Sequence, residues 1–394
     1  MTSPSYISTE AAAHRLDYTP QHVCRLVREG KLTGRKIGRD WIIASESIDH
    51  HLLLRENYAI PFGQDTEGTR SAPPPLPPGE QEPISFEEIL SGPEPSLAQK
   101  RLAKRLAWAN GALPSETLHR IFLADARVMD PLASERVQLI VTSPPYFNLV
   151  EYEAETAPAG QLGHLEDYQE FLDELDSVWR QCYELLVPGG RLCIVVGDVC
   201  ISRKAGGRHQ VLPLHADISV RCRRIGFDFL TPILWSKIAN MATEVGGKAR
   251  FLGKPYEPNA IIKNDVEYIL LLRKPGAYRK PTATQRALSL LDPDEQRRWF
   301  RSVWTDIQGE SRKAGHPAPF PTALAYRLIK MFSFVGDTVL DPFWGTGSTT
   351  MAAIDAVRSS VGFEIERKYV DIGRERLSQV RHTSVPPRIE FGLD

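Results

Sequence analysis

The chain has 394 residues, 42% hydrophobic and 25% charged, a composition typical of a globular protein with a large core and at least one further domain. Its formal net charge is −1, which excludes a uniformly basic surface, so a polyanionic partner would have to bind a local basic patch. The five cysteines form no CxxC pair, and the sequence has neither a signal pattern nor a long apolar run, so we expect a reduced, cytoplasmic protein without membrane contact.

Residues 1–58 carry the pattern of a winged helix-turn-helix domain. Ser8-Thr9 can cap a helix over 10–16, and Thr19-Pro20 can open a second helix over 21–29. Residues 31–44 then predict a two-stranded wing that turns at 38–40, and residues 45–54 predict a third helix. Between 25 and 39 six basic residues face one acidic residue, which indicates a phosphate-contacting face, although solvated surface can carry the same charge run. The DNA contacts predicted there are Arg25, Arg28, Arg35, Lys36 and Arg39.

Residues 59–96 are rich in proline, glycine and acidic residues, which predicts a semi-extended linker. From residue 97 to 394 apolar strands alternate with amphipathic helices, which indicates an α/β fold, a Rossmann-like doubly wound sheet with helices on both faces. The predicted strands are 137–141, 190–199, 227–235, 267–273, 338–342 and 360–364, and the predicted helices are 168–186, 218–225, 323–334, 348–355 and 369–380.

A cofactor site is predicted where the strand at 338–342 turns through Gly345 and Gly347 into a helix. The turn lacks the third glycine of a dinucleotide fingerprint and has no Gly-Lys-Ser/Thr, so a ligand without phosphates is favoured. Glu364 ends the next strand, where a carboxylate can accept hydrogen bonds from two ribose hydroxyls. S-adenosylmethionine fits these features, with its amino group near Asp341 and its methionine portion at the glycine turn.

A second motif, Ser143-Pro144-Pro145-Tyr146, follows the strand at 137–141. The Ser143 hydroxyl and the Pro144 carbonyl can each accept a hydrogen from an exocyclic amine, which localises the nitrogen lone pair for methylation. Tyr146 offers a face on which a base flipped out of a duplex can stack. A rigid loop after a strand is the plain alternative for this motif, and a surface aspartate is the plain alternative for Asp125, which we expect to bind the adenine amino group.

In this order the motifs resemble those of the DNA amino-methyltransferases in the permuted beta arrangement, over roughly 120–379. The resemblance implies a catalytic loop at 143–146, a cofactor loop at 341–348 that includes Pro342, Phe343 and Ser348, and a segment with Phe320 that closes over the methionine end of the cofactor. Serine in the first motif position is usual for cytosine N4 methylation and aspartate for adenine N6, so Ser143 favours cytosine. The amino-terminal module is similar to excisionase and MerR-like winged helices.

These features predict a site-specific methyltransferase that uses S-adenosyl-L-methionine on the N4 amine of cytosine in double-stranded DNA. The alternatives are methylation of adenine N6 or of RNA, and a non-enzymatic DNA-binding regulator. Insertions near 236–265, with Lys248 and Arg250, and near 278–312 are predicted to recognise the target. No metal-ligand spacing occurs among the histidines, and the chemistry needs no metal. The recognition sequence, the oligomeric state and a cognate restriction endonuclease are left open by the sequence.

Overall fold

The computed structural model describes residues 6–16, 20–28, 32–37, 40–48, 100, 103–104, 112–132, 135–147, 161–201, 207–236, 251–252, 257–258, 260–262, 264–309, 321–380 and 383–392. The chain divides into two compact units, residues 1–76 and 77–394. The predicted linker at 59–96 lies outside the described residues. No helix in the described ranges is both long enough and apolar enough to cross a membrane.

The amino-terminal unit combines two helices with a small antiparallel sheet. Helix α1 (Thr9–Leu16) and helix α2 (Pro20–Arg28) pack with strands β2 (Gly34–Ile37) and β3 (Asp40–Ala44), and residues 45–48 are helical. The Ser8 hydroxyl accepts a hydrogen bond from the Ala11 amide and so caps α1. A strand that was not predicted, β1 (Tyr6–Ser8), pairs with β3 and extends the hairpin to the sheet order β1-β3-β2.

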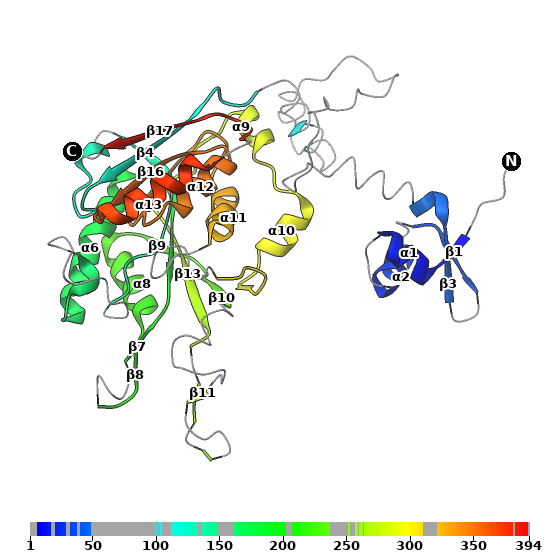
Figure 1. Ribbon diagram of the computed structural model, residues 1–394, viewed down its shortest axis with the longest axis horizontal. Coiled ribbons are helices and arrows are strands. Elements are labelled where there is room, and N and C mark those ends of the chain that lie inside the picture. The colour runs from blue at the N-terminus through cyan, green and yellow to red at the C-terminus, as the bar shows by residue number, and fades with distance from the viewer. Residues whose placement is uncertain are drawn as a thin grey trace. The chain divides into compact units, whose positions relative to one another are not determined.

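The second unit is built on a ten-stranded, mostly parallel sheet, drawn in Figure 1. Its main path runs β14 (Val303–Trp304), β10 (Ile233–Ser236), β13 (Val266–Arg273), β6 (Leu186–Val196), β5 (Val137–Thr142), β15 (Thr338–Asp341), β16 (Ser359–Glu364), β4 (Thr117–Leu123) and β17 (Pro387–Gly392). Strand β9 (Asp228–Phe229) pairs with β13 beside this path. Strand β13 runs antiparallel to its neighbours, so its first residues lie at the edge where β5, β6 and β15 end.

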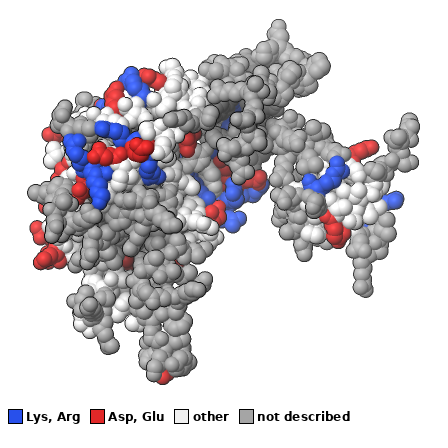
Figure 2. Space-filling view, viewed as in Figure 1, with Lys and Arg blue, Asp and Glu red and all other residues white. Residues whose placement is uncertain are grey.

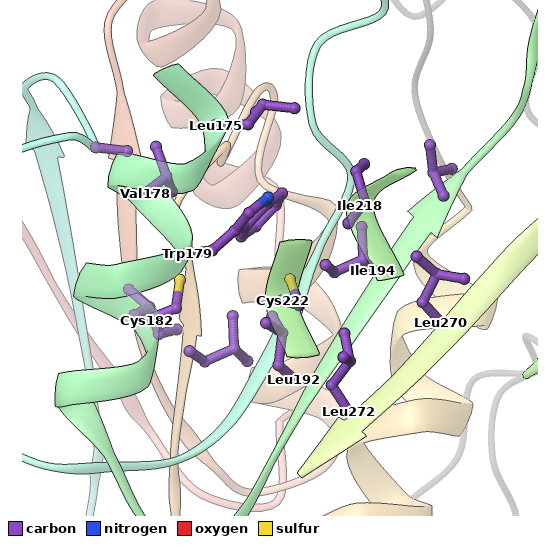
Figure 3. Close-up of a cluster of buried hydrophobic side chains, with 14 of the residues drawn as sticks. Leu175, Val178, Trp179, Cys182, Leu192, Ile194, Ile218, Cys222, Leu270 and Leu272 are labelled. Carbon is purple, nitrogen blue, oxygen red and sulfur yellow. The ribbon is translucent and has the colours of Figure 1, made fainter. Parts of the chain in front are cut away.

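Helices cover both faces of this sheet (Figure 1). Helices α6 (Tyr168–Leu185) and α8 (Leu214–Ile225) pack on one face, and α11 (Thr322–Phe332), α12 (Ser348–Asp355) and α13 (Arg367–Ser378) belong to the other. Asp167 caps α6 by accepting from the Gln169 and Glu170 amides. Figure 3 shows the core this creates, with Trp179 and Cys182 of α6 facing Cys222 of α8 over the strands. Burial of so many apolar side chains is the main stabilising term for the frame of the site.

Shorter elements connect these layers. They are the 3-10 turns η1 (Asp130–Leu132) and η2 (Leu162–His164), the hairpins β7 (Val199–Ile201) with β8 (Gln210–Leu212) and β11 (Phe251–Leu252) with β12 (Ile261–Ile262), and the helices α9 (Ala283–Leu288) and α10 (Pro293–Trp299).

Two predicted strands need correction. The strand expected over 227–235 is divided into β9 and β10, because Pro232 has no amide hydrogen to donate to a ladder. The strand expected over 190–199 begins at Leu186 and ends at Val196, and its pairing with β5 shifts register between Val137 and Leu139. Gly189, with φ of 77°, lies in the irregular part of β6.

Candidate active site

The two predicted motifs lie at the same edge of the sheet because their strands are neighbours. Strands β5 and β15 pair in parallel, with Ile140 opposite Leu340, so both strands end within two residues of this pair. At that edge the Thr142 hydroxyl donates a 2.7 Å hydrogen bond to Oδ1 of Asp341. Segments about 200 residues apart in the chain are thereby joined into one site.

Asp341 connects the catalytic loop to the helix that follows the cofactor loop. It is 1% exposed, and besides Thr142 it accepts a 3.1 Å bond from the Phe343 amide and a 2.6 Å bond from the Thr349 hydroxyl of α12. Burial raises the pKa of Asp341 to about 6, and its three donors oppose that rise. These internal bonds already engage both oxygens of a residue that we expected to lie near the cofactor amino group.

The cofactor loop at 341–348 has the backbone that its glycines allow. Gly345 and Gly347 have φ of 55° and 86°, a region that other residues adopt only at a cost in free energy. Beneath the loop the buried Trp344 ring lies against Gly362 of β16 and Gly373 of α13, where a Cβ would collide with it. The Trp344 indole donates a 2.8 Å bond to the Thr350 hydroxyl, which fixes the ring.

Glu364 lies beside the glycine turn, as the strand pattern predicts. Its Oε2 accepts a 2.7 Å bond from the Gly345 amide, and its Oε1 accepts a 2.9 Å bond from the Glu366 amide. Burial raises the pKa of Glu364 to about 8, in spite of these two donors. Because a carboxylate oxygen can accept two hydrogen bonds, each oxygen can receive one more donor, as a ribose diol requires. The donor set therefore fits an adenosine cofactor.

The catalytic loop continues directly from β5. Ser143 is half-buried, Pro144 is buried, and Pro145 and Tyr146 are half-buried. The Tyr146 hydroxyl donates a 3.0 Å hydrogen bond to Oε1 of Glu267, the second residue of β13. The loop is thus attached to the strand on the far side of β6.

Asp125, two residues past β4, is held by an ion pair. Both of its carboxylate oxygens accept from the guanidinium of Arg127, whose Nη1 also bonds Glu174 of α6 at 2.5 Å. An adenine amine would have to share these oxygens with Arg127, so the predicted contact stays a prediction.

Several predicted residues fall outside the described part of the chain. Phe320, Arg39, Lys248 and Arg250 lie outside it, and the side chains of Arg25 and Arg28 are likewise not described. Arg35 and Lys36 are exposed on β2. In the second insertion Arg279 pairs with Asp337, just before β15 begins and therefore at the edge away from the catalytic loop.

Three polar side chains at the catalytic edge were not predicted. Asp198 follows β6 and accepts a 2.6 Å bond from His215 of α8, whose ring stacks on Tyr268 with centroids 3.7 Å apart. Glu267 is 7% exposed beside them on β13. The signal for Asp198 was available, since Gly197-Asp198 follows an apolar strand, whereas His215 and Glu267 are recognisable only once the strands are arranged in space.

Surface charge is mixed rather than concentrated. Figure 2 shows basic and acidic side chains intermingled on the visible face of the second unit. A polyanion would therefore be held by particular segments near the catalytic edge rather than by the whole face.

Comparison with known proteins gives consistent relatives. The profile of a family described as "DNA methylase" matches residues 137–375. The Type II methyltransferase M.MjaI of Methanocaldococcus jannaschii is 38% identical over 66% of this chain and 91% of its own length. The Type II methyltransferase M.MthZI of Methanothermobacter thermautotrophicus is 34% identical over 67% of this chain and 78% of its own length. The crystal structure of a DNA modification methylase from Thermus thermophilus, TTHA0409, complexed with S-adenosyl-L-methionine, is 47% identical and covers 70% of this chain and 98% of its own, with a TM-score of 0.56.

Proposed function

The chain belongs to the N6/N4 DNA methylase family and is an S-adenosyl-L-methionine-dependent DNA methyltransferase, and from that premise we propose that its target is the N4 amine of cytosine in duplex DNA. The observation that carries the proposal is the position of Ser143, next to a threonine that donates to Asp341 at the head of the cofactor loop. Serine rather than aspartate at this motif position favours cytosine. The motif order, with 143–146 before 341–348, supports the permuted beta arrangement.

The bound cofactor supplies an electrophilic methyl group, and the residues of this chain prepare the amine that receives it. The Ser143 hydroxyl and the Pro144 carbonyl accept the two amine hydrogens, so that the nitrogen lone pair is drawn out of conjugation with the ring. Pro144 and Pro145 restrict the backbone, so these acceptors are held in place before the base arrives. Tyr146 presents a ring on which the base stacks once it has left the duplex.

Around the cofactor we assign the adenosine ribose to Glu364 and the methionine portion to the turn at 345–347. Asp125 and Phe343 are the proposed adenine contacts, with Asp125 shared between the adenine amine and Arg127. Phe343 packs edge-on against Trp179 of α6, with ring centroids 6.0 Å apart, so its ring is held by the core.

The target base is tested by incubating the protein with isotopically labelled cofactor and duplex DNA, then resolving the modified nucleosides by mass spectrometry. N4-methylcytosine is the expected product. N6-methyladenine would move the assignment to adenine, and an unlabelled product pool would favour the regulator alternative. Ser143→Ala should reduce transfer at least about a hundredfold, because the loss of one preorganised acceptor commonly has that effect, while cofactor binding persists. Sequencing DNA from cells that express the protein identifies the recognition duplex.

We further propose that residues 1–58 form a winged helix-turn-helix that grips the DNA backbone. Support comes from α1 and α2, which only residues 17–19 separate, and from the β2–β3 hairpin that exposes Arg35 and Lys36. Replacing both residues by alanine should lower the salt slope of DNA affinity by roughly 2, because each phosphate contact contributes about 0.9. Arg388→Ala, in an exposed ion pair on β17, is the control. An unchanged slope, or unchanged DNA affinity after deletion of residues 1–58, would contradict this assignment.

A further inference from the structure

The hydrogen bond between Tyr146 and Glu267 joins the catalytic loop to a fixed point on the sheet. The phenol oxygen lies 3.0 Å from Oε1 of Glu267, and the glutamate is 7% exposed. Gly197, immediately after β6, lies against both side chains: a Cβ there would be 3.4 Å from Cγ of Glu267 and 3.6 Å from Cε1 of Tyr146. The three residues therefore form one compact contact at the catalytic edge.

The acceptor is more firmly held than the residue it binds. Glu267 pairs in register with Trp235 of β10, and the indole of Trp235 donates a 3.0 Å bond to the Ile307 carbonyl. Tyr146, in contrast, lies on a loop. Side chains built on strands hold a geometry more closely than side chains on loops. A bond from a phenol to a carboxylate is also among the stronger hydrogen bonds in proteins.

The chemistry gives this bond a purpose. A base that stacks on Tyr146 meets the ring face, and the bond at the phenol oxygen leaves both faces available while it fixes the direction of the ring. A phenylalanine at this position could stack equally well but could not be tethered.

We propose that Glu267 is a positioning residue, which holds the Tyr146 ring in the orientation that receives the flipped base. The inference rests on the proposed function, because it presumes that Tyr146 stacks on the target. It makes the start of β13 part of the base pocket.

The test is a double-mutant cycle with Glu267→Ala and Tyr146→Phe in the full chain. The reporter is a recognition duplex that carries a fluorescent cytosine analogue at the target position, together with kcat and KM. Glu267→Ala should lower kcat and the flipped fraction about tenfold to a hundredfold, the range for a hydrogen bond to a charged group. Glu267→Gln, which keeps an acceptor oxygen, should recover most of both. In the Tyr146→Phe background the alanine substitution should have no further effect.

Two controls separate the inference from a loss of structure and from the proposed function. Affinity for S-adenosylhomocysteine should be unchanged in the Glu267 variants, and Glu184→Ala, exposed on α6, should behave as the wild type. Additive losses in the cycle, or Glu267→Gln as impaired as Glu267→Ala, would overturn the positioning role. Full activity of Tyr146→Ala would instead remove the stacking role of the tyrosine, and with it that part of the proposed function.

Discussion

Replacing Gly373 by alanine tests how the cofactor loop is supported, because two opposing effects meet at this residue. Gly373 lies within α13, where alanine normally stabilises a helix by about 1 kcal/mol relative to glycine. A Cβ at this position would, however, lie 2.6 Å from Cζ3 of Trp344 and 3.2 Å from the backbone carbonyl carbon of Thr346. Relief would require the indole to move by roughly 1 Å, since carbon atoms pack best at about 3.5 Å or more.

The indole has little room for that movement. A Cβ at Gly362 would be 2.6 Å from its Cγ, a Cβ at Gly347 would be 2.8 Å from its Cζ2, and its nitrogen is bonded to Thr350. Overpacking a well-filled core costs about 1–3 kcal/mol, and this enclosed site should lie near the upper end. The collision therefore outweighs the helix propensity, and we expect Gly373→Ala to lower the free energy of unfolding by about 2 kcal/mol.

Urea titrations followed by both circular dichroism and tryptophan fluorescence measure this difference, and coincidence of the two curves checks that a single transition is observed. Asp371→Ala, on the exposed face of the same helix, should change stability by less than about 0.5 kcal/mol. In a Trp344→Leu background the same Gly373 substitution should become stabilising by about 1 kcal/mol, since only the helix term remains. An equal loss in both backgrounds would refute the reasoning.

Three further outcomes follow from the site. Because burial raises the pKa of Glu364 to about 8, the free protein holds a proton there at neutral pH that the ribose hydroxyls must displace. Cofactor affinity should therefore rise about tenfold per pH unit up to about pH 8 and level off above it, and calorimetry in two buffers should detect the release of about one proton that Glu364→Gln abolishes. Thr142→Val removes one of three donors to the buried Asp341 carboxylate. It should lower the free energy of unfolding by about 1–3 kcal/mol in urea, and no change would mean that the bond contributes nothing. Asp125→Asn should weaken binding of S-adenosylhomocysteine less than about tenfold, because Arg127 already occupies both carboxylate oxygens, and should leave binding of the inosine analogue unchanged. Equal losses for both ligands would argue against an adenine contact.

Much of the frame was predictable because its signals are local. Helix α6 was predicted to within one residue, since a capping aspartate precedes a regular apolar stripe. The cofactor turn was likewise predicted from a buried strand followed by two glycines, both with positive φ. That the two motifs meet at one edge was a hypothesis about strand order, and the pairing of β5 with β15 confirms it.

The failures have a different physical origin, because they depend on residues distant in the chain. Glu267 begins an apolar strand and reads as a solvated end, and only the loop carrying Tyr146 gives it a partner. His215 is unremarkable in sequence until α8 sets its ring on Tyr268. The start of β6 was missed because Pro188 and Gly189 resemble a turn, whereas the strand passes through them by means of a register shift.

The antiparallel pairing of β10 with β13 determines how target choice can evolve. Ser236 and Val266 are paired directly, so both ends of the segment 237–265 leave from adjacent points of the sheet. A segment tied in this way can be exchanged as a cassette between relatives without disturbing the strands that carry it. New sequence preferences could therefore arise by replacement of this one excursion, while the methyl-transfer machinery is inherited intact.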